Sequence, residues 1–287
     1  MYDFVSTQEV GHPVRTVCST LGISRSSYYE YRKQKTYRVN QQELESVQRI
    51  FAVHRRRYGS RRISKALGHQ GIKMGRFKVR RLMKDGDLKA IQPRSFVPKT
   101  TNSKHTLGYA TNVLASIDFP EAPNRAFVGD ITYLPTTYGQ WLYLNVWIDL
   151  FSRRVVGWKL DTNMEEGLAV DSFNQAKNTR TPPKGLLVHT DRAGQYAGAA
   201  FKLALKGYVQ SMSGADNPYD NAHAESFFSR FKAELLQGGA FESLEDARTE
   251  VFNYIEMYYN THRLHSALGY LSPAQFELQY YEAEQNA

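Results

Sequence analysis

The chain has 287 residues, of which 41% are hydrophobic and 23% are charged. This balance is typical of a folded globular protein and excludes wholesale disorder, and the length allows two or three small domains. No apolar run approaches the roughly 18 residues of a membrane span, and the first residues do not form a secretion signal. Cys18 is the one cysteine, which excludes an internal disulfide and a cysteine zinc cage. We therefore expect a cytoplasmic protein.

Basic residues are concentrated in the first third of the chain. The net charge is +9, and residues 1–110 hold 23 Lys and Arg against 7 Asp and Glu, so the remainder is mildly acidic. This distribution indicates a nucleic-acid-binding region joined to another domain. Such a region binds DNA in a strongly salt-dependent way. A solvated basic surface explains the charge alone equally well.

Residues 1–39 contain a predicted helix-turn-helix. A short helix ends before Gly22, which supplies the turn, and Ser24 caps a second helix. The polar and basic start of this second helix places Arg25 and Ser26 to contact DNA in the major groove. A plain αα-hairpin is the alternative.

Residues 40–92 are expected to form a second, basic helical DNA-binding unit. Amphipathic helices are predicted over residues 41–57, from Ser60 to Gly71, and over residues 75–85. The basic residues exceed what packing requires, which favours contacts with phosphates. The predicted DNA contacts are Arg55, Arg56, Arg57, Arg61, Arg62, Arg76, Lys78, Arg80 and Arg81.

Residues 93–121 lack helical or strand periodicity and are expected to be a linker. A core domain follows over residues 122–238 and begins with a three-stranded antiparallel meander. A helix, a strand, a helix, a strand and a long helix complete a mixed five-stranded sheet flanked by helices, which is an α/β architecture. Residues 239–287 are expected to form a C-terminal helical tail with one helix over residues 243–260. The predicted strands are residues 125–134, 141–150, 155–160, 185–190 and 208–212, and the predicted helices are 165–178, 197–206 and 221–236.

Three carboxylates lie where ends of strands and a helix allow them to converge. Asp130 interrupts an otherwise apolar and β-branched strand, where an uncompensated carboxylate is costly. Asp191 follows an apolar strand, at the carboxyl end where ligands of open α/β sheets gather. Glu225 lies one turn into the long helix. Taken singly, each has a structural explanation as a cap or turn former. Asp149 is a rival carboxylate, interpreted either as structural or as a neighbour of the metal ligands.

Hard oxygen ligands of this kind suit Mg²⁺ or Mn²⁺. Two such ions per site, about 3.5–4 Å apart, stabilise the attacking and leaving oxygens of a phosphoryl displacement. We therefore expect Asp130, Asp191 and Glu225 to act as both catalytic residues and metal ligands. The central strand favours Asp130 as the bridging ligand.

Motifs along most of the chain resemble one known family, the transposases of bacterial insertion sequences that encode an integrase-type core on the second of two overlapping reading frames. Gly129–Tyr133, His189–Tyr196 and Glu225–Phe228 resemble the motifs around the family's three acidic residues. The helical segment ahead of the core is similar as well. Two departures are present: only 33 residues separate Asp191 from Glu225, and Arg192–Gly194 varies the usual residues after the second aspartate.

The resemblance implies a ribonuclease H-like fold and assigns Asp130, Asp191 and Glu225 as the acidic triad. It implies 3′-hydroxyl attack at terminal inverted repeats, with target DNA as a second DNA partner. It also implies a bacterial protein that is nucleoid-associated when bound to DNA, and self-association to at least a dimer during synapsis. In the family that the chain resembles, the helix-turn-helix that recognises the element ends and a leucine zipper usually belong to the upstream frame. This sequence has no heptad run of a leucine zipper, so we expect the chain to need the upstream-frame protein or a frameshifted fusion with it.

Other interpretations remain at this point. A DNA-binding regulator with an inactive integrase-like core is the main alternative. A retroelement integrase would require a zinc module that one cysteine cannot supply, and a cellular ribonuclease H would not need the basic helical region. His189 is either a packed core histidine or a group near the scissile phosphate. Asn221 is placed to cap its helix and to face the metal site. Arg263 and His265 are each compatible with a DNA contact or with a structural role.

Overall fold

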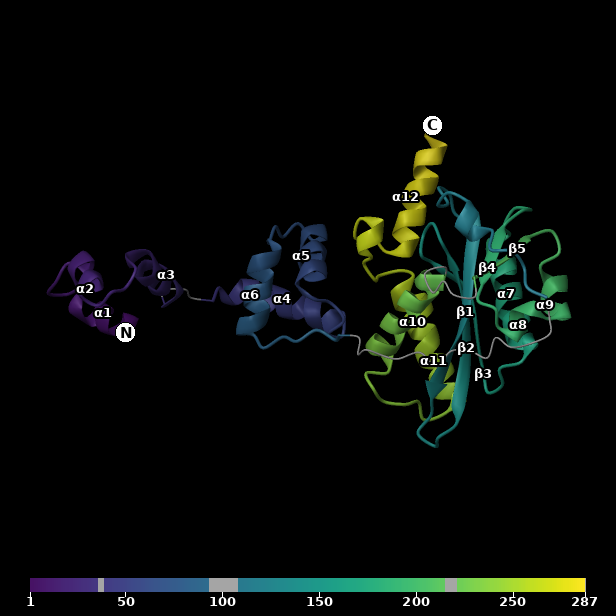
Figure 1. Ribbon diagram of the computed structural model, residues 1–287, viewed down its shortest axis with the longest axis horizontal. Coiled ribbons are helices and arrows are strands. Elements are labelled where there is room, and N and C mark those ends of the chain that lie inside the picture. Colours follow the sequence, from purple (N-terminus) through teal and green to yellow (C-terminus); the bar gives the residue numbers. More distant parts are fainter. Residues whose placement is uncertain (36–38, 93–107, 215–220, 287) are drawn as a thin grey trace. The chain divides into compact units, whose positions relative to one another are not determined.

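The computed structural model describes residues 1–35, 39–92, 108–214 and 221–286. The chain divides into two compact units, Met1–Lys89 and Ala90–Ala287 (Figure 1). Within the described residues, no helix combines the length and the apolar character that a bilayer crossing requires.

The first residues form three short helices, α1 (Tyr2–Gln8), α2 (Val14–Thr20) and α3 (Arg25–Lys35). Gly22 has a left-handed backbone (φ 64°) and makes the turn between α2 and α3, as expected. Helix α1 was not predicted, and it completes a small core around Tyr28, whose hydroxyl donates to Glu9. The predicted helix-turn-helix therefore has a third helix on which to pack.

A second group of helices follows, α4 (Gln41–Val53), α5 (Ser60–His69) and α6 (Arg76–Asp85). The side chain of Asn40 caps α4 by accepting from the backbone N–H of Glu43. Apolar side chains at helical spacing are buried on all three helices. They are Val47, Ile50 and Phe51 of α4, Ile63, Ala66 and Leu67 of α5, and Val79, Leu82 and Met83 of α6.

The second unit is built on a five-stranded sheet of order β3-β2-β1-β4-β5. Strands β1, β2 and β3 form the predicted antiparallel meander. Strand β4 pairs with β1 in parallel, and β5 pairs with β4 in parallel at the edge of the sheet. The expected mixed five-stranded α/β sheet is confirmed. The strands are β1 (Ala126–Pro135), β2 (Trp141–Asp149), β3 (Val155–Asp161), β4 (Leu187–Thr190) and β5 (Val209–Met212).

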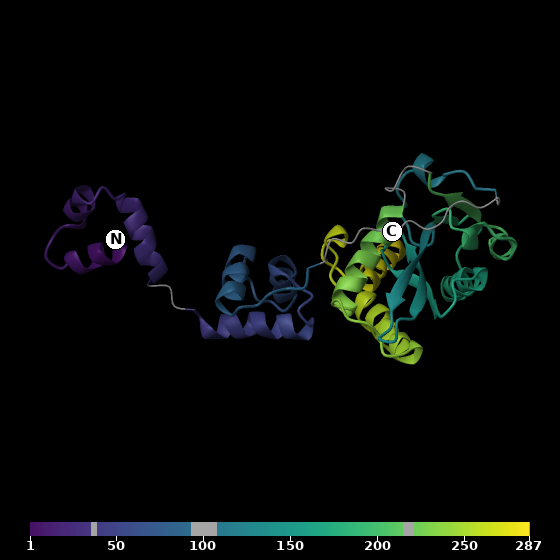
Figure 2. The ribbon, with the colours of Figure 1, turned by 60° about the horizontal axis from the view of Figure 1, so that its bottom comes forward.

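Helices cover both faces of this sheet (Figures 1 and 2). One face packs against α7 (Glu166–Arg180), α8 (Gly194–Ala197) and α9 (Ala199–Ala204). The predicted single helix over residues 197–206 is thus two short helices that meet at Gly198. A side chain there would overlap the carboxylate of Glu166, which accepts from the backbone N–H of Phe201.

The opposite face packs against α10 (Ala222–Leu235), α11 (Leu244–Phe252) and a π-helical segment, η3 (Asn253–Tyr259). Residues 239–287 were predicted to form a C-terminal helical tail, and within this segment α11 and η3 share one hydrophobic core with β1 and β2. The predicted helix over residues 243–260 also changes to π geometry after α11. Two further helices follow, η4 (Ser266–Leu268) and α12 (Pro273–Gln285).

The predicted linker ends in a segment that packs on the rest of the second unit. Residues 93–107 lie outside the described residues, whereas residues 108–121 contact the sheet and include a short helix, η1 (Leu114–Ser116). The hydroxyl of Ser211 on β5 accepts from the backbone N–H groups of Val113 and Leu114, at 2.9 and 3.1 Å. Two backbone donors of this mostly exposed segment are therefore satisfied by the core.

Candidate active site

The middle of β1 and the carboxyl end of β4 bring Asp130 and Asp191 together. These strands are parallel, and their last paired residues are Gly129 and Thr190. Asp130 is the first residue of β1 beyond this ladder, and Asp191 is the first residue after β4. The two aspartates therefore lie side by side at the carboxyl end of β4, where open α/β sheets place their ligands.

The electrostatics of Asp130 reflect this crowding. Burial raises the pKa of its carboxyl group well above the usual value, and the negative charge of Asp191 raises it further. The charge of Glu225 acts in the same direction, although the backbone N–H of Ile131 donates to Asp130 and opposes the shift. The three predicted carboxylates thus lie within electrostatic range of one another, and the site favours an added positive charge.

Helix α10 contributes Glu225 to this site from its first turn. Asp130 shares a sheet face with Val128, and Val128 packs in the same cluster as Phe227 and Phe228 of α10. Phe227 and Phe228 anchor the helix to the sheet, while Glu225 stays exposed. This arrangement directs the start of α10 towards the middle of β1 and the carboxyl end of β4.

Lys232 is a charged neighbour of Asp130 that the sequence analysis missed. Burial lowers the pKa of Lys232, and the negative charge of Asp130 opposes that shift. The positive charge of Lys232 in turn lowers the pKa of Asp130. The sequence held a signal for Lys232: it follows Glu225 by seven residues in the same helix, and two helical turns return a side chain to the same face.

A polar pair lies beneath the aspartates. The buried side-chain amide of Asn145 on β2 donates to the Tyr196 hydroxyl at 2.9 Å. Burial raises the pKa of Tyr196 well above its usual value, and the charges of Asp130 and Asp191 raise it further. A small hollow at this site is lined by the side chains of Asp130, Asp191, Gln195 and Tyr196. The floor of the site is therefore rigid and polar.

The donor chemistry of this site fits a hard divalent cation. Carboxylate oxygens are the ligands that Mg²⁺ and Mn²⁺ prefer, and the raised pKa of Asp130 marks a surplus of negative charge. Within the described ranges, no group of three or more His, Cys, Asp or Glu side chains forms a ready-made metal cluster.

Asp149 has a structural role, one of the two that the sequence analysis left open. Its buried carboxylate accepts from the backbone N–H groups of Asn124 and Ser152, at 2.6 and 3.0 Å. Burial nevertheless raises its pKa. Asp149 therefore secures the turn that follows β2 and is occupied by backbone donors.

His189 and Arg263, whose roles were open, are structural. The ring of His189 is fully buried between the hydroxyls of Ser211 and Ser213, at 2.8 and 3.1 Å. Arg263 is only 2% exposed and forms a two-pronged ion pair with Glu234 of α10, at 2.6 and 2.9 Å. Neither side chain is available to DNA.

The structure shows the surroundings of the two remaining residues whose roles were open, His265 and Asn221. His265 lies edge-on against the ring of Tyr259, with centroids 4.9 Å apart. Asn221 precedes α10 without a side-chain cap, and its buried Oδ1 has no hydrogen-bond partner among the described residues. Asn221 therefore occupies the N-cap position of α10 without capping it through its side chain.

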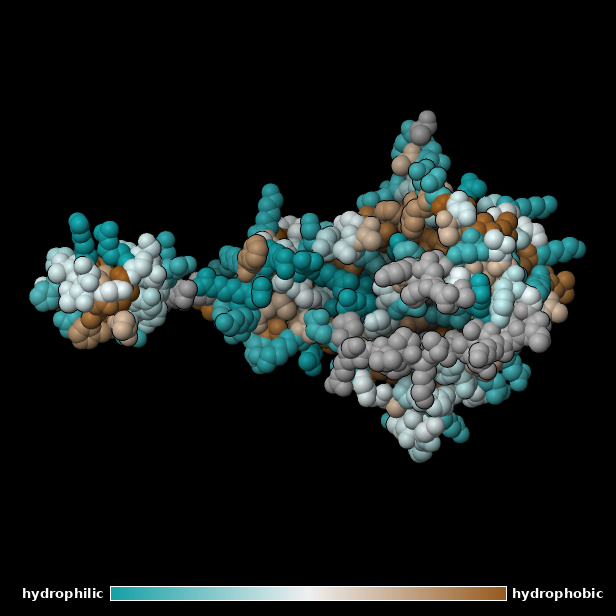
Figure 3. Space-filling view, viewed as in Figure 1, coloured by the Kyte–Doolittle hydropathy of each residue, from teal (hydrophilic) through white to brown (hydrophobic). Residues whose placement is uncertain are grey.

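The predicted DNA contacts differ in how they are presented. Most are exposed, including Arg25 and Ser26 at the start of α3. Hydrophilic side chains cover much of α4–α6, with a few apolar spots among them (Figure 3). The exposed members on this unit are Arg55, Arg56, Arg61, Arg76, Lys78, Arg80 and Arg81.

Three predicted contacts have partners inside the helical unit. Arg57 is only 8% exposed, so its prediction as a surface contact is wrong. Arg62 lies over the ring of Tyr58, with its guanidinium carbon 5.6 Å from the centroid. Lys78 forms an ion pair with Glu43 of α4. Helix packing therefore occupies part of the basic side chains that were predicted to contact DNA.

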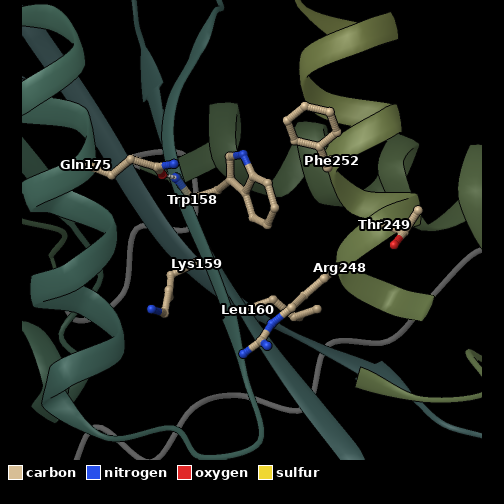
Figure 4. Close-up of a pocket in the computed structure, with 7 residues that line it drawn as sticks. All are labelled: Trp158, Lys159, Leu160, Gln175, Arg248, Thr249 and Phe252. Atoms are coloured by element: carbon tan, nitrogen blue, oxygen red, sulfur yellow. Dashed lines mark hydrogen bonds between the residues drawn. The ribbon is translucent and has the colours of Figure 1, made fainter. Parts of the chain in front are cut away.

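A larger hollow of about 620 Å³ lies away from the carboxylates. It is open, and side chains of β3, α7 and α11 line it (Figure 4). Trp158 and Phe252 supply apolar surface, and Lys159 and Arg248 supply positive charge. Among the described residues that line it, none is acidic, so this hollow differs in chemistry from the carboxylate site.

Family comparisons agree with this architecture. Residues 120–218 match one family described as an integrase core domain, and residues 225–280 match a second with the same description. The second match covers the helices that were expected to be a C-terminal tail. Residues 38–96 match a family described as an HTH-like domain, which is the region of α4–α6. Together with the strand order, the integrase-core match confirms the ribonuclease H-like fold.

Curated relatives cover most of the chain. The transposase for insertion sequence element IS904 of Lactococcus lactis is 42% identical over 81% of this chain and 92% of that protein. Transposase InsF for insertion sequence IS3A of Escherichia coli is 37% identical over 96% of this chain and 98% of that protein. Among solved structures, the magnesium complex of the HTLV-2 integrase catalytic core is 17% identical over 55% of this chain and 98% of that chain, with a TM-score of 0.43. The chain belongs to the family of bacterial insertion-sequence transposases that carry an integrase core domain.

Proposed function

We propose that the chain cleaves DNA at the ends of an insertion sequence and joins the 3′ ends to target DNA, using Asp130, Asp191 and Glu225. The observation that carries this proposal is the parallel register of Gly129 and Thr190, beyond which two aspartates follow side by side. The surplus negative charge at Asp130 supports it. Family membership supports transposition as the process.

The three carboxylates would hold two Mg²⁺ or Mn²⁺ ions during the reaction. Such ions lower the pKa of an attacking water or 3′-hydroxyl and stabilise the departing oxygen. Asp130 suits the bridging position because both other carboxylates raise its pKa. Lys232 offsets part of the negative charge at Asp130, and Tyr196 and Asn145 give the aspartates a rigid floor.

DNA binding is assigned to the basic helical units. The exposed residues Arg25 and Ser26 on α3, and the exposed arginines of the α4–α6 unit, would contact phosphates and base edges. The DNA partners would be the terminal inverted repeats and the target. The upstream-frame protein, or a fusion with it, and a second copy of this chain would complete the synaptic assembly.

The test is strand transfer in a defined reaction. The chain would be incubated with a pre-cleaved element-end oligonucleotide and supercoiled target in Mg²⁺ or Mn²⁺, with and without the upstream-frame protein. We expect joined products from the wild type and none from Glu225→Gln or in EDTA. Glu242→Gln is the matched control, because Glu242 is an exposed glutamate outside the site.

The outcomes separate the alternatives. Products that survive Glu225→Gln would refute the assignment of the third carboxylate. Absence of products under every condition, together with intact DNA binding, would favour a DNA-binding regulator with an inactive core.

A further inference from the structure

Helix α6 presents a mixed face to solvent. Phe77, Arg80, Arg81 and Lys84 are spaced by three, four and seven residues, so they lie along one side of the helix. The buried residues Val79, Leu82 and Met83 occupy the opposite side. Phe77 is 77% exposed and lies in the first turn of the helix.

A basic face needs no phenyl ring to bind phosphates. A single exposed apolar residue is common on protein surfaces and is not a site by itself. The position of Phe77 is informative because cations surround it. The guanidinium carbon of Arg76 lies 5.7 Å from its ring centroid, and Arg80 follows one turn later.

The cations on this face differ from others in the same unit. Lys78, on a different side of α6, forms an ion pair with Glu43. Within the described part of the chain, by contrast, no ion pair engages Arg80 or Lys84. The α6 face thus combines exposed positive charge with one apolar ring, which is the chemistry complementary to the major groove at thymine.

We propose that Phe77 reads thymine methyl groups in the major groove while Arg80, Arg81 and Lys84 contact nearby phosphates or guanine edges. This inference rests on the proposed DNA-binding function and adds a residue that determines sequence preference. The major groove admits an α-helix, and the C5-methyl group of thymine is an apolar mark that an aromatic side chain can contact. In this arrangement α6 is the recognition helix of the HTH-like region.

The test uses full-length chain and two labelled duplexes, one carrying an end of the genetic element that encodes the chain and one scrambled. In a second series, each thymine of the end duplex is replaced by deoxyuridine, which removes only the methyl group. Phe77→Ala is compared with wild type, Arg80→Ala and the control Leu203→Ala, which removes a side chain 73% exposed on α9. Circular dichroism verifies folding of each variant.

We expect deoxyuridine at one or a few positions to weaken wild-type binding. Phe77→Ala should lose about tenfold in its preference for the end duplex, and should bind thymine and deoxyuridine duplexes equally. Arg80→Ala should weaken binding to both the end and the scrambled duplex and reduce the salt dependence. Leu203→Ala should match wild type.

The outcomes are distinguishable. If wild type binds neither duplex at low salt, with or without the upstream-frame protein, the DNA-binding function itself fails. If wild type prefers the end duplex and Phe77→Ala keeps both this preference and the deoxyuridine effect, only the assignment of Phe77 is overturned. If Phe77→Ala binds DNA normally but loses association with the upstream-frame protein, the face docks protein and the inference is wrong.

Discussion

The two regions of the molecule treat charge in opposite ways. In the catalytic unit, two buried glutamates are paired with arginines, Glu234 with Arg263 and Glu277 with Arg154 and Arg180. Residues 40–89, which span α4–α6, hold 14 Lys and Arg against 4 Asp and Glu, so positive side chains far outnumber negative ones.

In each region, the charged side chains that are not balanced by opposite charge indicate which kind of ligand the region binds. In the catalytic unit, Asp130, Asp191 and Glu225 are acidic neighbours for which Lys232 supplies partial compensation. In the helical unit, the surplus is positive. Uncompensated charge is costly unless a ligand of opposite sign binds there, so the first region suits cations and the second suits phosphates.

The largest effect on stability is expected from breaking the Glu234–Arg263 pair. Arg263→Ala leaves a buried carboxylate at Glu234 without its cation, which costs about 3–5 kcal/mol. Urea denaturation would measure this loss. Arg248→Ala removes an exposed arginine of α11 and should leave the midpoint nearly unchanged. Equal midpoints for the two variants would show that the buried pair does not stabilise the unit.

A smaller loss is expected at Gly129, directly before Asp130. A Cβ at this position would overlap the ring of Trp147, so Gly129→Ala should cost about 1–3 kcal/mol through overpacking. It should also lower strand transfer, because the strand that carries Asp130 must shift. Gly167→Ala in α7 meets no atom within 4 Å and should be neutral or stabilising. Thermal denaturation of both variants checks the difference.

Removal of charge at Asp130 should stabilise the folded protein while abolishing activity. The folded-state pKa of Asp130 lies well above its ordinary value of 3.8, so the folded state binds this proton more tightly than the unfolded state. The stability that comes from this tighter proton binding is fully present below the ordinary pKa of 3.8 and is lost as pH rises through the raised pKa of the folded state. At neutral pH, Asp130→Asn should therefore melt at a higher temperature than wild type in metal-free buffer.

Added metal and changes in pH should alter the stability difference between the wild type and Asp130→Asn. Mg²⁺ should raise the melting temperature of wild type more than that of Asp130→Asn. The stability difference between the two proteins should shrink as pH falls through the raised pKa of folded Asp130, and should vanish only below the ordinary value of 3.8, where Asp130 is protonated in both states. A difference that stays constant with pH would argue against burial and carboxylate repulsion as its cause.

The smallest effect is expected at Lys78, which the sequence analysis placed among the DNA contacts. Its ion pair with Glu43 is partly exposed, so Lys78→Ala should cost about 0.2–1 kcal/mol of stability. It should weaken DNA binding less than Arg80→Ala does. Fluorescence anisotropy at several salt concentrations measures this contrast. A larger loss of affinity for Lys78→Ala would mean that DNA displaces Glu43 from this pair.

Much of the catalytic fold follows from local patterns. Strand alternation, turn residues and chain order predicted the meander and the sheet, because side-chain period and short connections are local properties. Asp130 and Asp191 were identifiable because each follows or interrupts an apolar strand. Lys232 was equally identifiable from helical spacing but needed Glu225 as a reference.

Other features depend on contacts between distant segments. The helices after residue 238 resemble a polar tail in sequence, yet Val251, Ile255 and Tyr259 enter the same core as β1 and β2. Residues 113 and 114 dock because Ser211, almost a hundred positions later, accepts from their backbone. No local pattern contains such a partner.

The sequence by itself determined the identity of the strands, the basic and acidic division of the chain, and the three carboxylates that belong to the family motifs. Tertiary structure alone decided which charged side chains remain for ligands: Arg263, Arg57 and Asp149 are occupied by internal partners or buried, whereas Phe77 and Arg80 face solvent. The physical reason is that residue type sets the chemistry of a side chain, whereas burial and its nearest neighbours set whether that chemistry is satisfied within the fold or remains for a ligand.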